Sequence, residues 1–142
     1  MEILTKSAKE TKALGKKIAA NLKGGAILAL TGELGSGKTT FAQGLAKGLG
    51  IKQRIISPTF ILVRKYDLGS KNFYHIDFYR LETGIEKEVR NLGIEEIWDD
   101  PKNIVVIEWA EKIKKMVPEN ATWIEFKNLG ENERKIKTSK KL

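Results

Sequence analysis

Gly32-Glu33-Leu34-Gly35-Ser36-Gly37-Lys38-Thr39 is the most informative segment of this 142-residue chain. It matches the pattern G-x-x-x-x-G-K-[ST], in which successive backbone N–H groups surround a phosphate group. Glycine at positions 32, 35 and 37 permits the backbone angles and the close approach that such a cradle needs. An ordinary Gly-rich turn would need neither Lys38 nor Thr39 at its end. The pattern therefore predicts a nucleotide-binding loop.

The residues on either side of this loop predict the strand and the helix that it connects. Residues 26–30 form a short apolar run that is typical of a buried parallel strand. Residues 40–46 have helical spacing, and Gly50 is expected to end that helix. The start of the helix would point its partial positive charge at a phosphate. There Lys38 is expected to reach the outer phosphates, and the Thr39 hydroxyl is expected to ligate Mg²⁺.

The remaining sequence predicts further helices and strands around this unit. A capping-box pattern at Ser7 predicts a first helix over about residues 7–21, which Gly24-Gly25 is expected to end. The other expected elements are helices over 85–92 and 110–116, a buried strand over 104–107, and two hairpins that pair 60–66 with 73–78 and 123–127 with 134–137. The chain has no internal repeat or linker. Residues 1–142 are therefore expected to form one domain, with a short basic tail at about 138–142.

The composition limits the chemistry that this chain can perform. It contains no Cys and a single His, His75, so thiol chemistry and Cys- or His-rich metal sites are excluded. Any bound metal is expected to have oxygen ligands, which suits Mg²⁺. No apolar run approaches the roughly 18 residues that span a bilayer, and the polar N-terminus does not resemble a secretory signal. We therefore expect a cytoplasmic protein without a membrane partner.

The net charge of +8 is unevenly distributed along the chain. Residues 134–142 contain five basic and no acidic residues, which leaves +3 for the rest. Such a tail is more often solvated than bound, and contact with RNA is the alternative interpretation. The tail has no aromatic residues interleaved with the basic ones, and the sequence has no nucleic-acid-binding motif, so nothing further supports RNA contact.

A carboxylate follows the second apolar run of the sequence. Residues 104–107 are apolar, and Glu108 and Trp109 come directly after them. In phosphate-loop ATPases a central strand delivers an acid in this way to the side of the metal. Without the phosphate loop, a solvent-facing acid would be the simpler interpretation. With it, Glu108 is predicted to ligate Mg²⁺ or to orient water.

Further segments resemble one known family. After the phosphate loop the chain contains, in this order, Ser57-Pro58-Thr59-Phe60, His75-Ile76-Asp77-Phe78-Tyr79-Arg80-Leu81, Leu92-Gly93-Ile94-Glu95-Glu96 and Glu108-Trp109. This series resembles the TsaE (YjeE) family, the small bacterial ATPases of tRNA threonylcarbamoyladenosine synthesis. The resemblance extends from Glu10-Thr11 to the terminal strand at Arg134. Phe78 stands where Leu is more usual, and Ser36 stands where Ala is common.

The resemblance implies both a fold and a function. The fold is an α/β, three-layer, P-loop NTPase-like structure with a mixed sheet, a parallel centre and antiparallel flanking strands. The function is that of an accessory protein that binds and hydrolyses ATP with Mg²⁺ and acts on the TsaB and TsaD pair. That pair transfers threonylcarbamoyl to the tRNA adenosine beside the anticodon. A weak ATPase that its partners stimulate is implied, and not the transferase itself.

The resemblance also implies roles for individual residues. The phosphate-binding residues are Gly35, Ser36, Gly37, Lys38, Thr39 and Thr40. Thr11 and Arg134 match positions that approach the adenine. Thr39 and Glu108 are the expected metal ligands, and Lys38, Asp77 and Glu108 are the expected catalytic residues.

Several neighbouring residues have two interpretations. Ser57-Pro58-Thr59 fits either a switch-like loop that senses the terminal phosphate or a turn fixed by proline. Trp109 either stacks near the nucleotide or packs under the sheet, and Arg80 either stabilises the transferred phosphate or pairs with Asp77. His75 is interpreted as a packed strand residue rather than a base.

Three other functions are compatible with a phosphate loop. A stand-alone small-molecule phosphotransferase usually has an Arg-rich lid, whereas the five Arg of this chain are scattered. A GTP-binding switch would contain an N-K-x-D motif, which is absent, so ATP is favoured over GTP. An RNA-binding module with a structural nucleotide is supported only by the basic tail.

Overall fold

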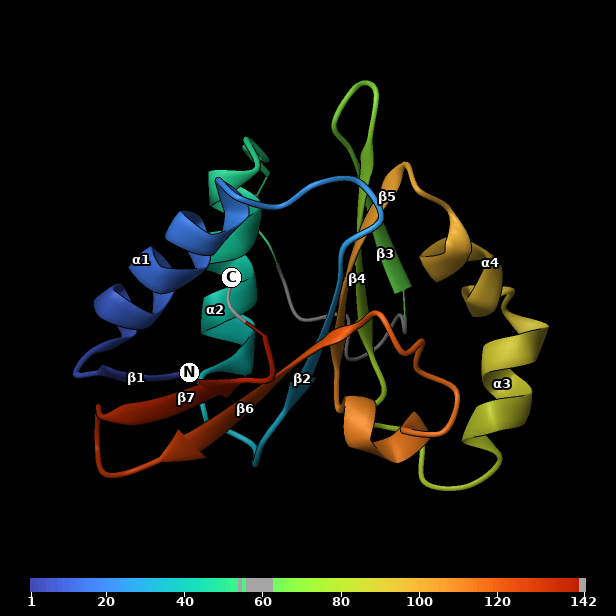
Figure 1. Ribbon diagram of the computed structural model, residues 1–142. Coiled ribbons are helices and arrows are strands. Elements are labelled where there is room, and N and C mark those ends of the chain that lie inside the picture. Colours follow the sequence, from blue (N-terminus) through green and yellow to red (C-terminus); the bar gives the residue numbers. More distant parts are fainter. Residues whose placement is uncertain (54, 56–62, 141–142) are drawn as a thin grey trace.

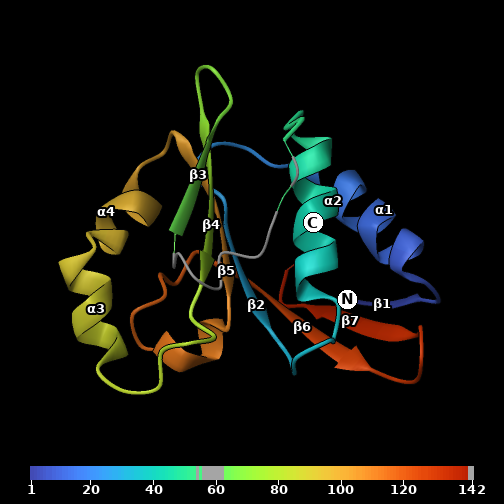
Figure 2. The ribbon, with the colours of Figure 1, turned by 180° about the vertical axis from the view of Figure 1, so that it is seen from behind.

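Figure 1 shows the computed structural model of the chain, which describes residues 1–53, 55 and 63–140. A sheet forms the middle layer, and helices cover both of its faces. On one face lie α1 (Ala8–Ala19) and α2 (Lys38–Gly48). On the other lie α3 (Ile85–Asn91), α4 (Ile94–Asp99) and the short 3₁₀-helix η1 (Ala110–Ile113). The view from behind in Figure 2 shows the same three layers.

The sheet is mixed, with a parallel centre. Its seven described strands are, in order across the sheet, β1 (Glu2–Thr5), β7 (Arg134–Thr138), β6 (Thr122–Asn128), β2 (Ile27–Thr31), β5 (Asn103–Glu108), β4 (Asn72–Asp77) and β3 (Val63–Asp67). The neighbours β6, β2, β5 and β4 run parallel, and β1, β7 and β3 pair antiparallel at the sides. This arrangement confirms the predicted fold class.

The central strands are apolar because helices cover them on both faces. Every residue of β5 is buried, and so are the first four residues of β2. Phe41 and Leu45 of α2 pack in the core on one face, and Trp98 of α4 packs in the core on the other. The carboxyl ends of β2, β5 and β4 are thereby held together at one edge of the sheet.

Glycine allows α1 and α2 to approach each other closely. A Cβ atom on Gly44 would overlap the carbonyl group of Lys12, and one on Gly15 would overlap the carbonyl oxygen of Phe41. The two helix backbones are therefore in direct contact, which no residue with a side chain would permit at these positions. This contact brings the start of α1 next to the phosphate loop.

Most of the predicted elements are present. Ser7 caps α1 by accepting a hydrogen bond from the Glu10 backbone N–H (3.1 Å), while the Glu10 carboxylate accepts one from the Lys6 N–H rather than from Ser7. The helix ends at Ala19, before Gly24-Gly25. The sequence does not predict β1 or α4. Ser57-Pro58-Thr59 and the start of the first predicted hairpin, residues 60–62, lie outside the described residues.

No helix in the described part of the chain is long and apolar enough to cross a membrane.

Candidate functional site

The phosphate loop connects β2 to α2, as predicted. The backbone φ angles of Gly32, Gly35 and Gly37 are +138°, +79° and +104°, a region that residues with side chains rarely adopt. Gly37 is the N-cap of α2 and provides no side-chain hydrogen bond to the first turn. The first N–H groups of α2 are therefore left for an anion at the helix start.

A buried hydroxyl in this loop fits a bound phosphate. Ser36 is 1% exposed, and its Oγ has no hydrogen-bond partner among the described residues. Buried polar groups almost always have a partner, so an unpaired hydroxyl beside the start of α2 fits a ligand oxygen at this position. The cradle thus fits a phosphate group in both shape and hydrogen-bonding capacity.

Lys38 lies above the loop and under an aromatic ring. Its Nζ contacts the carbonyl oxygens of Gly32 and Glu33 and lies 3.7 Å from the centre of the Trp109 ring. Burial lowers the pKa of the Lys38 ammonium below its ordinary value, although the carboxylates of Glu111, Glu108 and Asp77 oppose that shift. Lys38 is 4% exposed, so its ammonium is only weakly solvated.

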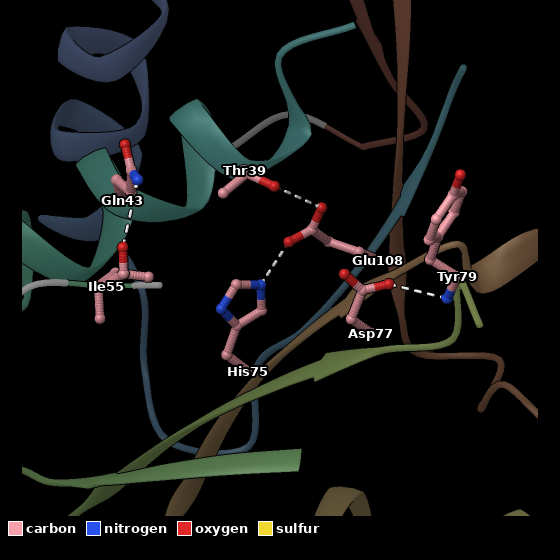
Figure 3. Close-up of polar contacts among 7 residues, drawn as sticks. All are labelled: Thr39, Gln43, Ile55, His75, Asp77, Tyr79 and Glu108. Atoms are coloured by element: carbon pink, nitrogen blue, oxygen red, sulfur yellow. Dashed lines mark hydrogen bonds and ion pairs between the residues drawn. The ribbon is translucent and has the colours of Figure 1, made fainter. Parts of the chain in front are cut away.

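Glu108 connects the start of α2 to the middle of the sheet (Figure 3). The Thr39 hydroxyl donates a hydrogen bond to Glu108 Oε1 (3.0 Å). His75 Nε2 lies 2.5 Å from the other carboxylate oxygen, and Nε2 is the donor when Glu108 is ionised. His75 is fully buried and Glu108 is 2% exposed. Both oxygens of Glu108 are therefore held in fixed directions.

His75 is a packed strand residue, as predicted, but it also has a specific polar contact. It lies on β4 next to Val106 of β5, two residues before Glu108. Its Nδ1 has no hydrogen-bond partner among the described residues. The contact with Glu108 depends on the register between two strands, which the sequence does not reveal.

Asp77 lies beside Glu108 at the same edge of the sheet. In the parallel register of β4 and β5 the two residues are direct partners. Asp77 is 3% exposed, and its Oδ1 accepts a hydrogen bond from the Tyr79 backbone N–H (2.9 Å). Since parallel strands deliver their last residues to one edge, the two acids and Thr39 meet where the sheet faces the phosphate loop.

The oxygen atoms at this edge fit Mg²⁺. Thr39 and Glu108 offer a hydroxyl and a carboxylate within hydrogen-bond distance of each other, and Asp77 is adjacent. Within the described ranges, no group of three or more His, Cys, Asp or Glu side chains could hold an ion. Mg²⁺ usually keeps several waters and takes phosphate oxygens as ligands, so a small protein set suffices.

Lys112 of η1 ties together the loops that follow β4 and β5. Its Nζ donates to the backbone carbonyl oxygens of Phe78 (3.1 Å), Tyr79 (2.8 Å) and Leu81 (2.9 Å).

Trp109, at the start of η1, has a φ of +60°, which is unusual for a residue with a large side chain. Its ring packs against Tyr79, with 5.3 Å between ring centres. Trp109 therefore contacts both the loop after β4 and the ammonium of Lys38.

Arg134 and Thr11 lie beside Gly37 of the phosphate loop. The Arg134 guanidinium donates to the Gly35 carbonyl oxygen (3.1 Å) and to the Asn128 side chain (3.1 Å), which connects the β6–β7 hairpin to the phosphate loop. Thr11 is buried in α1, and its hydroxyl lies 2.7 Å from that of Thr5.

These groups surround one cavity of about 390 Å³. It is lined by Ala8, Thr11, Leu34, Gly35, Ser36, Gly37, Lys38, Thr39, Thr40, Asp77, Tyr79, Glu108, Trp109, Asn132 and Arg134. All ten site residues that the sequence analysis assigns are in this set, and their roles stay predictions. Arg80 is not in it. The sequence patterns give no site role to four other lining residues, Ala8, Leu34, Tyr79 and Asn132, and Asn132, in a hairpin loop, belongs to no pattern that could have revealed it.

Comparisons with known proteins agree on one family. A family model described as "Threonylcarbamoyl adenosine biosynthesis protein TsaE" matches residues 5–136. The "tRNA threonylcarbamoyladenosine biosynthesis protein TsaE" of Bacillus subtilis is 40% identical over 132 residues, which are 93% of this chain and 80% of that protein. Its namesake in Treponema pallidum is 35% identical over 136 residues, 96% of this chain and 98% of that protein. The crystal structure of Bacillus subtilis YdiB superposes with a TM-score of 0.75 at 34% identity, covering 96% of this chain and 82% of that one.

Proposed function

This chain belongs to the TsaE family of tRNA threonylcarbamoyladenosine biosynthesis proteins, and from that premise we propose that it is a weak, Mg²⁺-dependent ATPase. The observation that carries the proposal is the cavity at the end of β2. It combines a glycine cradle, an unpaired Ser36 hydroxyl and the Thr39–Glu108 pair. We propose that ATP binding and hydrolysis there support the action of TsaB and TsaD on tRNA in the cytoplasm.

The phosphate groups would be bound by the loop and by Lys38. The N–H groups around Gly35 and Gly37 and the Ser36 hydroxyl offer donors at the positive end of α2. Lys38 would exchange its contacts with Gly32 and Glu33 for phosphate oxygens. Thr11 and Arg134 also line the cavity, beside Gly37, and the adenine would be bound near them.

The acids at the strand ends would direct the hydrolysis. Thr39 and Glu108 would hold Mg²⁺, which supplies positive charge to the phosphate oxygens when it is bound. Glu108 is held from both sides by Thr39 and His75, so its carboxylate can orient a water or a metal ligand without rearranging. Asp77 offers a second carboxylate beside it.

The cavity gives a reason why the isolated chain should hydrolyse ATP slowly. Among the described residues, its lining contains two cationic side chains, Lys38 and Arg134. The guanidinium of Arg134 donates to the carbonyl oxygens of Gly35, Gly130 and Glu133 and to Asn128. In related enzymes, an additional cation at the terminal phosphate raises the rate of hydrolysis by about three to five orders of magnitude. We propose that TsaB and TsaD either provide this charge or order the Ser57-Pro58-Thr59 segment.

Single-turnover hydrolysis of ATP tests this proposal. The rate is measured for the chain alone and with the purified TsaB and TsaD pair, at saturating ATP and Mg²⁺, with Lys38→Ala as the inactive control. We expect slow release of phosphate by the chain alone, a large increase with the pair, and little activity in Lys38→Ala. A fast isolated enzyme that ignores the pair, or transfer only to an added small acceptor, would indicate a stand-alone phosphotransferase instead.

A further inference from the structure

The two helical layers of the molecule carry opposite charge. Segments 6–23 and 38–53 contain α1 and α2, and they expose eight lysines against a single acid, Glu10. The lysines are Lys6, Lys9, Lys12, Lys16, Lys17, Lys23, Lys47 and Lys52. Segment 82–100, which contains α3 and α4, has the acids Glu82, Glu86, Glu88, Glu95, Glu96, Asp99 and Asp100 but only two cations, Lys87 and Arg90. Figures 1 and 2 show these layers on opposite faces of the sheet.

The positive charge of the α1–α2 layer is not neutralised from within. None of its eight exposed lysines forms an ion pair with a described residue. The cations near the C-terminus differ in this respect. Lys135 Nζ lies 3.6 Å from the Glu2 carboxylate, Lys137 is in register with Glu2 on one side and Glu125 on the other, and Lys140 donates to the Asn120 carbonyl oxygen. Among the described residues, the cations of the C-terminal strand are therefore partly compensated, whereas those of the two helices are not.

Part of this surface is a hollow with no carboxylate in it. Lys12 of α1 and Lys47 and Lys52, near the end of α2, line a depression of about 720 Å³ together with two glutamines. The side chain of one of them, Gln43, donates to the carbonyl oxygen of Ile55, which also lines the hollow (3.2 Å; Figure 3). Three ammonium groups around one depression favour an anionic ligand.

The chemistry of this face favours RNA over an acidic protein. The large apolar side chains that the described chain exposes are Met1, Leu4, Leu34, Tyr79, Leu92 and Leu129, and none of them is on α1 or α2. Protein interfaces have an apolar core and are depleted in lysine, whereas lysine contacts nucleic-acid phosphates as a mobile point charge. The relatives of this chain are tRNA modification proteins by name.

We propose that the α1–α2 face binds the phosphate backbone of tRNA, with Lys12, Lys47 and Lys52 around the central hollow. The binding is electrostatic and independent of RNA sequence, because lysines offer no fixed pattern of donors to base edges. The inference rests on the proposed role in tRNA modification but not on ATP hydrolysis. It places RNA contact on the helices rather than on the C-terminal tail, for which such contact is only the alternative interpretation.

The test compares two triple variants that have the same net charge. The variant Lys12→Gln, Lys47→Gln, Lys52→Gln removes the charges of the hollow. The control Lys127→Gln, Lys135→Gln, Lys137→Gln removes three charges from the β6–β7 hairpin. Binding of an unmodified tRNA transcript to the full chain is measured by fluorescence anisotropy over a range of KCl concentrations, and thermal melting confirms that both variants fold.

The salt dependence separates local contacts from net charge. By the values known for DNA, each lost phosphate contact reduces the magnitude of the slope of log K against log[salt] by about 0.9 for a duplex or about 0.7 for a single strand. We expect the helix variant to lose about two to three units of slope and the control to keep the parental slope. Equal losses in both variants, a loss only in the control, or a parent that does not bind tRNA at low salt would overturn the proposal. So would polyglutamate that binds more tightly than tRNA.

ATP hydrolysis measured on the same preparations keeps this inference separate from the proposed function. We expect both triple variants to hydrolyse ATP like the parent, because none of the six lysines lines the nucleotide cavity. A chain that binds tRNA through the hollow without hydrolysing ATP would retain this inference and refute the ATPase. A chain that hydrolyses ATP but does not bind tRNA through the hollow would support the ATPase and refute this inference.

Discussion

Replacing His75 by Leu removes the donor that holds one carboxylate oxygen of Glu108 and leaves an apolar side chain in a fully buried site. A hydrogen bond to a charged group contributes about 1.5–3 kcal/mol. If that energy keeps Glu108 aligned in the transition state, its loss corresponds to a turnover about 10- to 150-fold lower. ATP affinity should change much less, because the contact lies behind Glu108 and not in the cavity. Single-turnover hydrolysis with TsaB and TsaD, together with ATP titration, measures the two effects separately.

Two further variants separate positioning of Glu108 from a general loss of structure. His75→Gln supplies an amide N–H near the position of the imidazole nitrogen and should recover part of the rate. In a Glu108→Ala background, His75→Leu should have little additional effect, since its influence passes through that carboxylate. The reasoning is refuted if His75→Leu keeps the parental rate, or if it lowers the rate equally with and without Glu108. A parallel loss of ATP affinity would indicate a structural role only.

Three other substitutions test separate parts of the structure. Thr39→Ala removes a proposed metal ligand and should lower hydrolysis at least about tenfold, with a higher Mg²⁺ requirement; a parental rate at limiting Mg²⁺ would disprove the assignment. Lys112→Met removes three contacts to backbone carbonyl oxygens and should speed amide exchange at residues 79–81, and unchanged exchange would show that other contacts hold this loop. Gly44→Ala places a methyl group against Lys12 of α1 and should lower the free energy of unfolding in urea by about 1–3 kcal/mol. An unchanged free energy of unfolding in the Gly44→Ala variant would mean that the helices separate easily.

The features that the sequence predicts well are local. The phosphate loop depends on backbone angles that only glycine adopts readily, and on a strand and a helix directly next to it in the chain. Glu108 is predictable for the same reason, because an acid after a short apolar run lies at the edge of a parallel sheet. These signals lie within a few residues of each other, so a single sequence suffices to read them.

The features that the sequence does not predict depend on contacts between distant segments. The His75–Glu108 contact requires the parallel register of β4 and β5, and the Lys112 contacts require the loop after β4 to fold back over η1. β1 is short and pairs on one side only, with β7 near the other end of the chain. The lysine face likewise emerges only when α1 and α2 pack side by side.

Binding of ATP to the isolated chain, measured by calorimetry with and without Mg²⁺, tests the central claim most directly. The parent and Lys38→Ala are titrated under identical conditions, and a melting curve shows that both fold. We predict saturable binding at one site for the parent with Mg²⁺, weaker binding without the metal, and a large loss of affinity in Lys38→Ala. No binding by the parent, or equal binding by Lys38→Ala, would contradict the account of the phosphate loop.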